Sequence, residues 1–194
     1  MRRALQKWQI VNFAAIAIAT VFISILAFKG TNEASFRILI RLTARSSAVL
    51  FLLAFTASPL QRLKPSNLSN WMLRNRRYFG LSMAISHGFH AVAIAGVAVL
   101  TSESMVGRDS LDASLGYVFI FLMTITSFPY PAAILGRRNW KVLHTVGMYY
   151  LWLSFTVAFG SRIAEAWLFY LPVTVILIAT LMLRVALLVK MRRT

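Results

Sequence analysis

Six stretches of this sequence contain no Asp, Glu, Lys or Arg, and their lengths constrain the fold more than any other feature. They are 16 to 25 residues long and comprise Trp8–Phe28, Ser46–Gln61, Tyr78–Ser102, Ala113–Gly136, Val142–Ser161 and Ala166–Leu183. A transmembrane helix needs about 20 mostly apolar residues to cross the hydrocarbon core of a bilayer. Because a bilayer offers no water to unpaired backbone groups, such spans are helical. The sequence therefore predicts an all-α integral membrane protein.

The predicted spans follow these runs, except that the second begins earlier, near Ile38, because Ile38, Leu39, Ile40 and Leu42 precede its run. We expect six helices: Trp8–Phe28, Ile38–Gln61, Phe79–Leu100, Ser114–Leu135, Lys141–Gly160 and Ala166–Val189. Short connections favour an up-and-down bundle, which makes residues 1–194 a single transmembrane domain. The longest connection, residues 62–77, is polar and basic, and we expect it to lie along the inner membrane surface.

The distribution of charge predicts the orientation of the spans. The chain carries 21 Lys and Arg against 5 Asp and Glu, a net charge of +16. Fifteen of the basic residues fall on the side of the two termini, while six basic residues and all five acids fall on the other side. Basic residues concentrate in cytoplasmic loops and attract anionic lipid. This predicts a membrane protein with both termini in the cytoplasm and argues against nucleic acid binding.

Three histidines are the candidate site residues, because a metal-binding side chain inside a span indicates function. From the 1.5 Å rise per residue, His87 and His90 lie about 12 and 17 Å deep in the third span, and His144 about 8 Å deep in the fifth. Neutral imidazole ligates haem iron, and helix bundles hold haem between facing helices. The alternative is that these are buried histidines bonded to neighbouring Ser or backbone carbonyls.

Other chemistries have little support in the sequence. The chain has no cysteine and no acidic residue within the spans, which disfavours iron–sulfur and zinc sites. Arg37, Arg41 and Arg45 form a stripe at the outer end of the second span. These arginines are expected to snorkel to the membrane surface, and Arg45 is also a candidate partner for a haem propionate.

Three segments together resemble the ferric reductase-like transmembrane domain family. Ala44–Leu63 reads ARSSAVLFLLAFTASPLQRL, Arg76–His90 reads RRYFGLSMAISHGFH and Arg137–Tyr150 reads RRNWKVLHTVGMYY. They look most like the compact bacterial branch that includes the haem-binding membrane subunit of the periplasmic methionine sulfoxide reductase system. The resemblance covers nearly the whole chain, and the order of the motifs along the spans agrees with it.

The resemblance implies haem b between the histidine-bearing helices and electron transfer through the membrane. Larger members of the family carry a fused cytoplasmic flavin domain that supplies electrons, and this sequence contains none. The electron donor implied is therefore a separate flavoprotein or a quinone, with flavin or quinone supplied by the partner. A periplasmic reductase is the acceptor that the branch suggests.

One departure from the family pattern limits the number of haems. The family has a second histidine about thirteen residues after the first in the fifth span, and this position is Val157. Three histidines allow at most one haem with two histidine ligands. Depth favours pairing His87 with His144, offset by about 4 Å, whereas the family position favours His90. Both pairings stay open.

We therefore expect a haem b-binding electron-transfer subunit of a membrane reductase system rather than a complete enzyme. One alternative is a family member that has lost redox function and serves as a membrane scaffold. Another is a small transporter, although no chain of ionisable residues crosses the predicted membrane. An absorption spectrum of the purified protein distinguishes the first possibility from the other two.

Overall fold

A computed structural model describes residues 5–101 and 108–193, and these residues form seven α-helices and no strand. The helices are α1 (Trp8–Lys29), α2 (Glu33–Leu63), α3 (Asn67–Thr101), α4 (Arg108–Ile125), α5 (Pro129–Leu135), α6 (Arg137–Gly160) and α7 (Trp167–Arg193). The all-helical fold expected from the sequence is confirmed.

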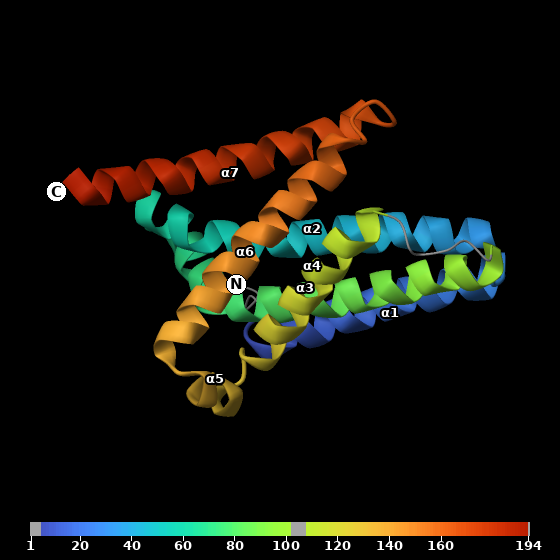
Figure 1. Ribbon diagram of the computed structural model, residues 1–194, viewed down its shortest axis with the longest axis horizontal. Coiled ribbons are helices and arrows are strands. Elements are labelled where there is room, and N and C mark those ends of the chain that lie inside the picture. Colours follow the sequence, from blue (N-terminus) through green and yellow to red (C-terminus); the bar gives the residue numbers. More distant parts are fainter. Residues whose placement is uncertain (1–4, 102–107, 194) are drawn as a thin grey trace. The chain divides into compact units, whose positions relative to one another are not determined.

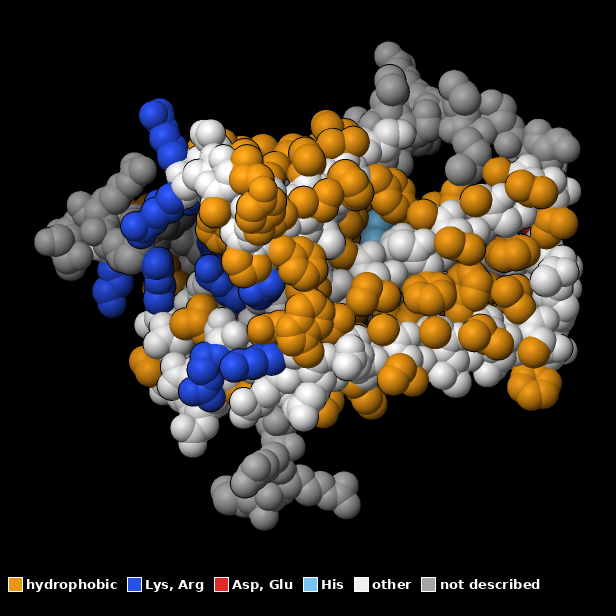
Figure 2. Space-filling view, turned by 90° about the horizontal axis from the view of Figure 1, so that it is seen from below, with side chains coloured by type: hydrophobic (Ala, Val, Ile, Leu, Met, Phe, Trp, Pro, Cys, Tyr) orange, Lys and Arg blue, Asp and Glu red, His pale blue; other side chains and the backbone are white. Residues whose placement is uncertain are grey.

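Five of these helices are long and apolar enough to cross a membrane, or six if α4 and α5 together count as one span. Many of their large apolar side chains are exposed, including Phe13, Ile16 and Leu168 at 63%, 67% and 74%. Figure 2 shows hydrophobic side chains over much of the visible face. An apolar surface of this extent fits a lipid environment rather than water. The chain is thus a membrane protein by the length and composition of its helices.

The chain divides into two compact units that alternate along the sequence. The first unit comprises Met1–Ala54 and Asn75–Leu111, and the second comprises Phe55–Arg74 and Asp112–Thr194. Helices α2 and α3 therefore contribute to both units. His87 and His90 belong to the first unit, whereas His144 belongs to the second.

Helices α1, α2 and α3 pack together in the first unit (Figure 1). Phe22, Leu39 and Ala93, one from each helix, form its buried centre. The approach of α2 to α3 is close at Gly96, where an added Cβ would lie 2.5 Å from the ring of Phe36. A small residue at such a contact lets two transmembrane helices approach.

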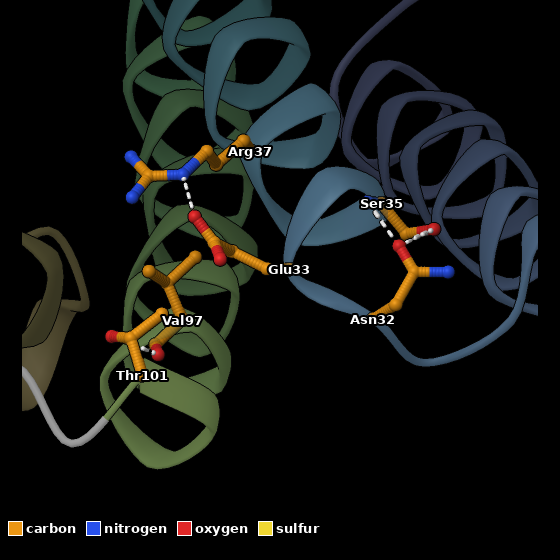
Figure 3. A network of polar contacts seen from close by, with 6 residues as sticks. All are labelled: Asn32, Glu33, Ser35, Arg37, Val97 and Thr101. Carbon is orange, nitrogen blue, oxygen red and sulfur yellow. Dashed lines mark hydrogen bonds and ion pairs between the residues drawn. The ribbon is translucent and has the colours of Figure 1, made fainter.

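The turn between α1 and α2 is held by its own side chains, as Figure 3 shows. The side-chain oxygen of Asn32 accepts hydrogen bonds from the backbone N–H and the hydroxyl of Ser35, at 3.0 and 3.2 Å. One turn along α2, Arg37 donates to Glu33. The bond from the Ser35 N–H satisfies one of the backbone groups at the start of a helix, which otherwise have no partner within it. Helix α2 consequently starts at Glu33, five residues before the predicted Ile38.

The long connection expected over residues 62–77 is mostly helical, because α3 starts at Asn67. Ser66 and Ser69 cap this start reciprocally. The hydroxyl of Ser69 accepts a hydrogen bond from the backbone N–H of Ser66 at 2.9 Å, and the hydroxyl of Ser66 accepts one from the backbone N–H of Ser69 at 3.1 Å. This is a serine version of the capping box. The connection between the second and third helices is therefore shorter than expected, because α2 ends at Leu63 and α3 starts at Asn67.

The single helix predicted over Ser114–Leu135 is also wrong, since α4 and α5 are bent by 108° at the break between them. Pro129 starts α5 and Pro131 follows two residues later. Proline has no N–H to donate and its ring clashes with the preceding turn, so a helix cannot continue straight through this segment. The break leaves α4 as an 18-residue helix followed by a short second one.

In the second unit, α6 and α7 form a helical hairpin (Figure 1). The indole of Trp152 on α6 donates to the backbone carbonyl of Leu177 on α7 at 2.8 Å. Helix α6 also approaches α4 closely, because an added Cβ at Gly147 would lie 2.5 Å from the sulfur of Met123. Trp152 thus joins α6 to α7 within the hairpin.

Candidate functional site

His90 is held by α2 through its ring nitrogen Nδ1. Its Nδ1 lies 3.1 Å from the backbone carbonyl of Ile40 and 3.0 Å from the hydroxyl of Thr43. A carbonyl can only accept, so Nδ1 carries the proton and Nε2 carries the lone pair. The hydroxyl of Thr43 donates to Leu39 at 2.7 Å, which leaves it as a second acceptor for His90. An imidazole whose Nδ1–H bonds a backbone carbonyl is the arrangement typical of metal-ligating histidines.

A cluster of hydroxyl groups lies about one helical turn from His90, on the same contact between α2 and α3. The hydroxyl of Ser86 accepts from Ser47 at 2.9 Å, lies 2.7 Å from that of Ser46, and donates to the backbone carbonyl of Thr43 at 3.1 Å. Ser47 and Ser86 are fully buried. Buried polar groups of this kind fix the register of the helices only when they are satisfied by partners. The serine cluster therefore fixes the height of His90 relative to Thr43.

His87 lies beside His90 rather than opposite it. The ring centroids are 5.1 Å apart and the planes are inclined by 36°. Two rings three residues apart on one helix approach a planar cofactor from the same side. The structure therefore brings His87 and His90 together, and only one of them can serve as an axial ligand of a given haem. The hydrogen bonds to Ile40 and Thr43 fix the orientation of the His90 ring.

His144 is held in the opposite way. Its Nε2 lies 3.0 Å from the hydroxyl of Thr126, which donates to the carbonyl of Leu122 at 2.6 Å and so accepts from the imidazole. The ring stacks on Trp140 with 4.3 Å between the centroids. In this geometry Nε2 carries the proton, so ligation through that nitrogen requires the bond to Thr126 to open. As it stands, His144 fits the predicted role of haem ligand less well than His90.

The remaining predicted positions differ in exposure. Arg41 is exposed and Arg45 is half-buried. Arg45 is two residues after Thr43, and the helical repeat turns it about 200° away from the side that holds His90. Val157, at the position of the missing family histidine, is 61% exposed. Thus Arg45 does not share the side of α2 that carries Thr43.

Within the ranges that the structure describes, no three His, Cys, Asp or Glu side chains gather as a metal site would require. A haem needs only one or two protein ligands, so this finding bears on other metals rather than on haem. Comparisons of the chain with models of protein families, with curated proteins and with solved structures found no match.

Sequence reasoning missed two polar arrangements. One is the cluster of Ser46, Ser47 and Ser86, whose partners depend on how two helices pack. The other is Arg184, whose guanidinium donates to the backbone carbonyl of Phe55 at 2.7 and 3.2 Å. A signal for the second existed, because Pro59 within the second span leaves the carbonyl four residues earlier without a helical donor.

Proposed function

We propose that this chain is a haem b-binding membrane protein that transfers electrons for a reductase system, with His90 as an axial ligand. The observation that carries the proposal is the bond from Nδ1–H of His90 to the carbonyl of Ile40, which leaves the lone pair on Nε2. When bound, haem supplies one-electron redox chemistry. The protein supplies the ligand, its orientation and an apolar environment.

The surroundings of His90 support this role over that of a packing residue. The Nδ1 of His90 has two acceptors, on Ile40 and Thr43. Acceptors at Nδ1 raise the basicity of Nε2 and hold the plane of the ring, which strengthens its bond to a metal. The serine cluster next to this contact keeps α2 and α3 in the register that these bonds require.

His144 is our candidate for the other axial ligand, on the basis of the sequence pattern around it. It is the one histidine of the chain outside α3. His144 would hold the iron through Nε2 only without its bond to Thr126. The donor is a separate flavoprotein or a quinone, and a periplasmic reductase is the acceptor. The charge distribution predicts both termini in the cytoplasm, and the resemblance implies the inner membrane of a bacterium.

The test is the absorption spectrum of the full chain, purified in detergent after expression with haem precursor, in oxidised and reduced forms. We expect the Soret and α bands of low-spin haem b in the wild type. His90→Ala should abolish them or convert them to a high-spin spectrum. His87→Ala is the matched control, because it removes an adjacent imidazole from the same helix and should keep the low-spin spectrum.

A second variant separates ligation by His144 from its structural role. In His144→Gln the side-chain amide can still donate to Thr126 but cannot ligate haem iron in place of imidazole. Loss of six-coordination in a protein that remains folded supports His144 as the ligand. Wild-type protein that binds no haem, even after reconstitution with hemin, overturns the proposal and favours the scaffold or transporter.

A further inference from the structure

The bend between α4 and α5 places a short apolar helix next to a cluster of basic residues. Helix α5 contains no charged residue and none of its residues is buried. Tyr130 and Ile134 are exposed at 78% and 72%. Gly136 follows with a φ of 77°, a conformation that favours glycine, and α6 starts at the next residue. Exposed apolar side chains on a helix this short do not fit a water-facing surface.

The bend between α4 and α5 is a turn held by side-chain hydrogen bonds, not a solvated loop. The hydroxyl of Thr126 donates to the carbonyl of Leu122 at 2.6 Å, and that of Ser127 donates to Met123 at 2.7 Å. The indole of Trp140 donates to the carbonyl of Thr126 at 2.8 Å. Backbone groups at a break within a membrane need partners of this kind, because lipid supplies none. The turn is therefore suited to low-polarity surroundings.

Helix α4 counts as a membrane span only together with α5. Its 18 residues extend about 27 Å at 1.5 Å per residue, against a hydrocarbon core of about 30 Å, and Arg108, Asp109 and Asp112 occupy its first turns. A helix that turns through 108° at the end of α4 leaves the direction of the membrane normal. We therefore consider α5 as a segment that lies along the membrane surface.

The charge next to α5 identifies the lipid that this surface fits. Arg137, Arg138 and Lys141 are all exposed on the first turns of α6. No acidic residue occurs between Asp112 and Glu165 in the sequence, so no local carboxylate in this stretch neutralises them. Basic residues beside an apolar interfacial helix attract anionic headgroups.

We propose that α5 and the first turns of α6 form an interfacial site for anionic phospholipid. Tyr130 and Ile134 enter the boundary between headgroups and acyl chains, while Arg137, Arg138 and Lys141 bind the phosphate groups. This site lies wholly within the second unit and does not depend on haem. In this arrangement the last residues of the fourth charge-free run lie on the membrane and do not cross it.

The depth of α5 is tested by spin labelling in vesicles of phosphatidylcholine and phosphatidylglycerol. The chain contains no cysteine, so a single introduced cysteine carries the only label. We expect the label of Ile134→Cys to be shallow in the bilayer, more accessible to oxygen than to a water-soluble nickel chelate. Leu153→Cys, on α6, serves as the deep reference and Lys64→Cys as the aqueous reference. The proposal is overturned if the label at residue 134 is as deep as the label at residue 153. It is also overturned if that label is as accessible to the nickel chelate as the label at residue 64.

Lipid selectivity is tested by the fraction of spin-labelled phosphatidylglycerol immobilised by the full chain, relative to labelled phosphatidylcholine. Replacing Arg137, Arg138 and Lys141 with Gln should weaken the association of phosphatidylglycerol by about five-fold for each charge removed. A triple replacement of Lys29, Arg41 and Arg162 with Gln removes the same charge elsewhere and should leave the preference unchanged. Equal effects of the two triple variants overturn a specific site. If the variant without Arg137, Arg138 and Lys141 keeps its preference for phosphatidylglycerol and residue 134 lies in water, the result instead indicates a surface for a soluble acidic protein.

Discussion

The guanidinium of Arg184 donates two hydrogen bonds to the backbone carbonyl of Phe55, from Nη2 at 2.7 Å and from Nε at 3.2 Å. Phe55 precedes Pro59 by four residues, so in an uninterrupted helix its carbonyl would accept from the N–H that proline lacks. Arg184 replaces that donor from another helix, α7. Its guanidinium also lies 4.1 Å from the centroid of the Phe55 ring, a cation–π contact. A charge within a membrane helix is thus used to satisfy the backbone at a proline.

This relationship predicts that Arg184 and Pro59 are energetically coupled. Arg184→Gln should lower the free energy of unfolding by about 1.5–3 kcal/mol, the contribution of a hydrogen bond to a charged group. In a Pro59→Ala background the loss should be much smaller, because the alanine N–H can donate to Phe55. Unfolding in mixed micelles, followed by circular dichroism for the four proteins of the cycle, measures the coupling.

A second proline provides the control for this cycle. Pro172 lies within α7, and its replacement by alanine also restores a helical donor, but not to Phe55. The decrease in the free energy of unfolding caused by Arg184→Gln should therefore be the same in the Pro172→Ala background as in the wild type. If Pro59→Ala and Pro172→Ala change the destabilisation caused by Arg184→Gln equally, the donor role assigned to Arg184 is wrong.

Two glycine variants on α3 test how closely α2 and α3 pack. Gly96→Ala should destabilise the protein by about 1–3 kcal/mol, because the new methyl group overlaps the ring of Phe36. Gly88→Ala lies on the same helix with nothing within 4 Å of the added Cβ. It should be neutral or stabilising by up to about 1 kcal/mol, since alanine is the better helix former. Thermal unfolding in one detergent compares them, and equal losses at both positions would contradict the close approach.

The sequence was most informative where one physical property decides the structure. Helix α1 ends at Lys29, one residue beyond the predicted Phe28, because a run without charges must end near the edge of the hydrocarbon core. The start of α3 at Asn67 was missed because its first turns are polar and basic, and hydropathy alone does not reveal a helix capped by Ser66 and Ser69. The bend after Ile125 had a signal in Pro129 and Pro131, which the charge-free run obscured.

The positions of the histidines along their helices were predictable from the sequence, but their hydrogen bonds were not. The rise per residue places His87 and His90 near the middle of α3 from the sequence alone. Which of the two is oriented by α2 depends on the register between the helices, and that register depends on Thr43 and the serine cluster. The tautomer of His144 likewise depends on Thr126, whose hydroxyl reaches it only because α4 ends beside α6.

The predicted orientation has its own test in a chain without cysteine. Thr31→Cys, exposed in the turn before α2, should react with a membrane-impermeant maleimide added to intact spheroplasts. Lys64→Cys, exposed between α2 and α3, should react only after the membrane is opened. The reason is the concentration of basic residues on the side of Lys64. The reverse pattern of labelling would place both termini in the periplasm.

The hydroxyl of Thr43 provides the final prediction, which applies if haem is bound at His90. Thr43→Val preserves the shape of the side chain and removes one of the two acceptors at Nδ1, while Ile40 still holds the ring. The haem should stay bound and low-spin. Its reduction potential should rise by up to about 60 mV, because a less basic imidazole stabilises ferric iron less and one hydrogen bond contributes about 0.5–1.5 kcal/mol. Thr156→Val is the matched control, since that hydroxyl bonds only the carbonyl of Trp152 one turn before it among the contacts described for it. A spectroelectrochemical titration in which both variants keep the wild-type potential would show that Thr43 does not tune His90.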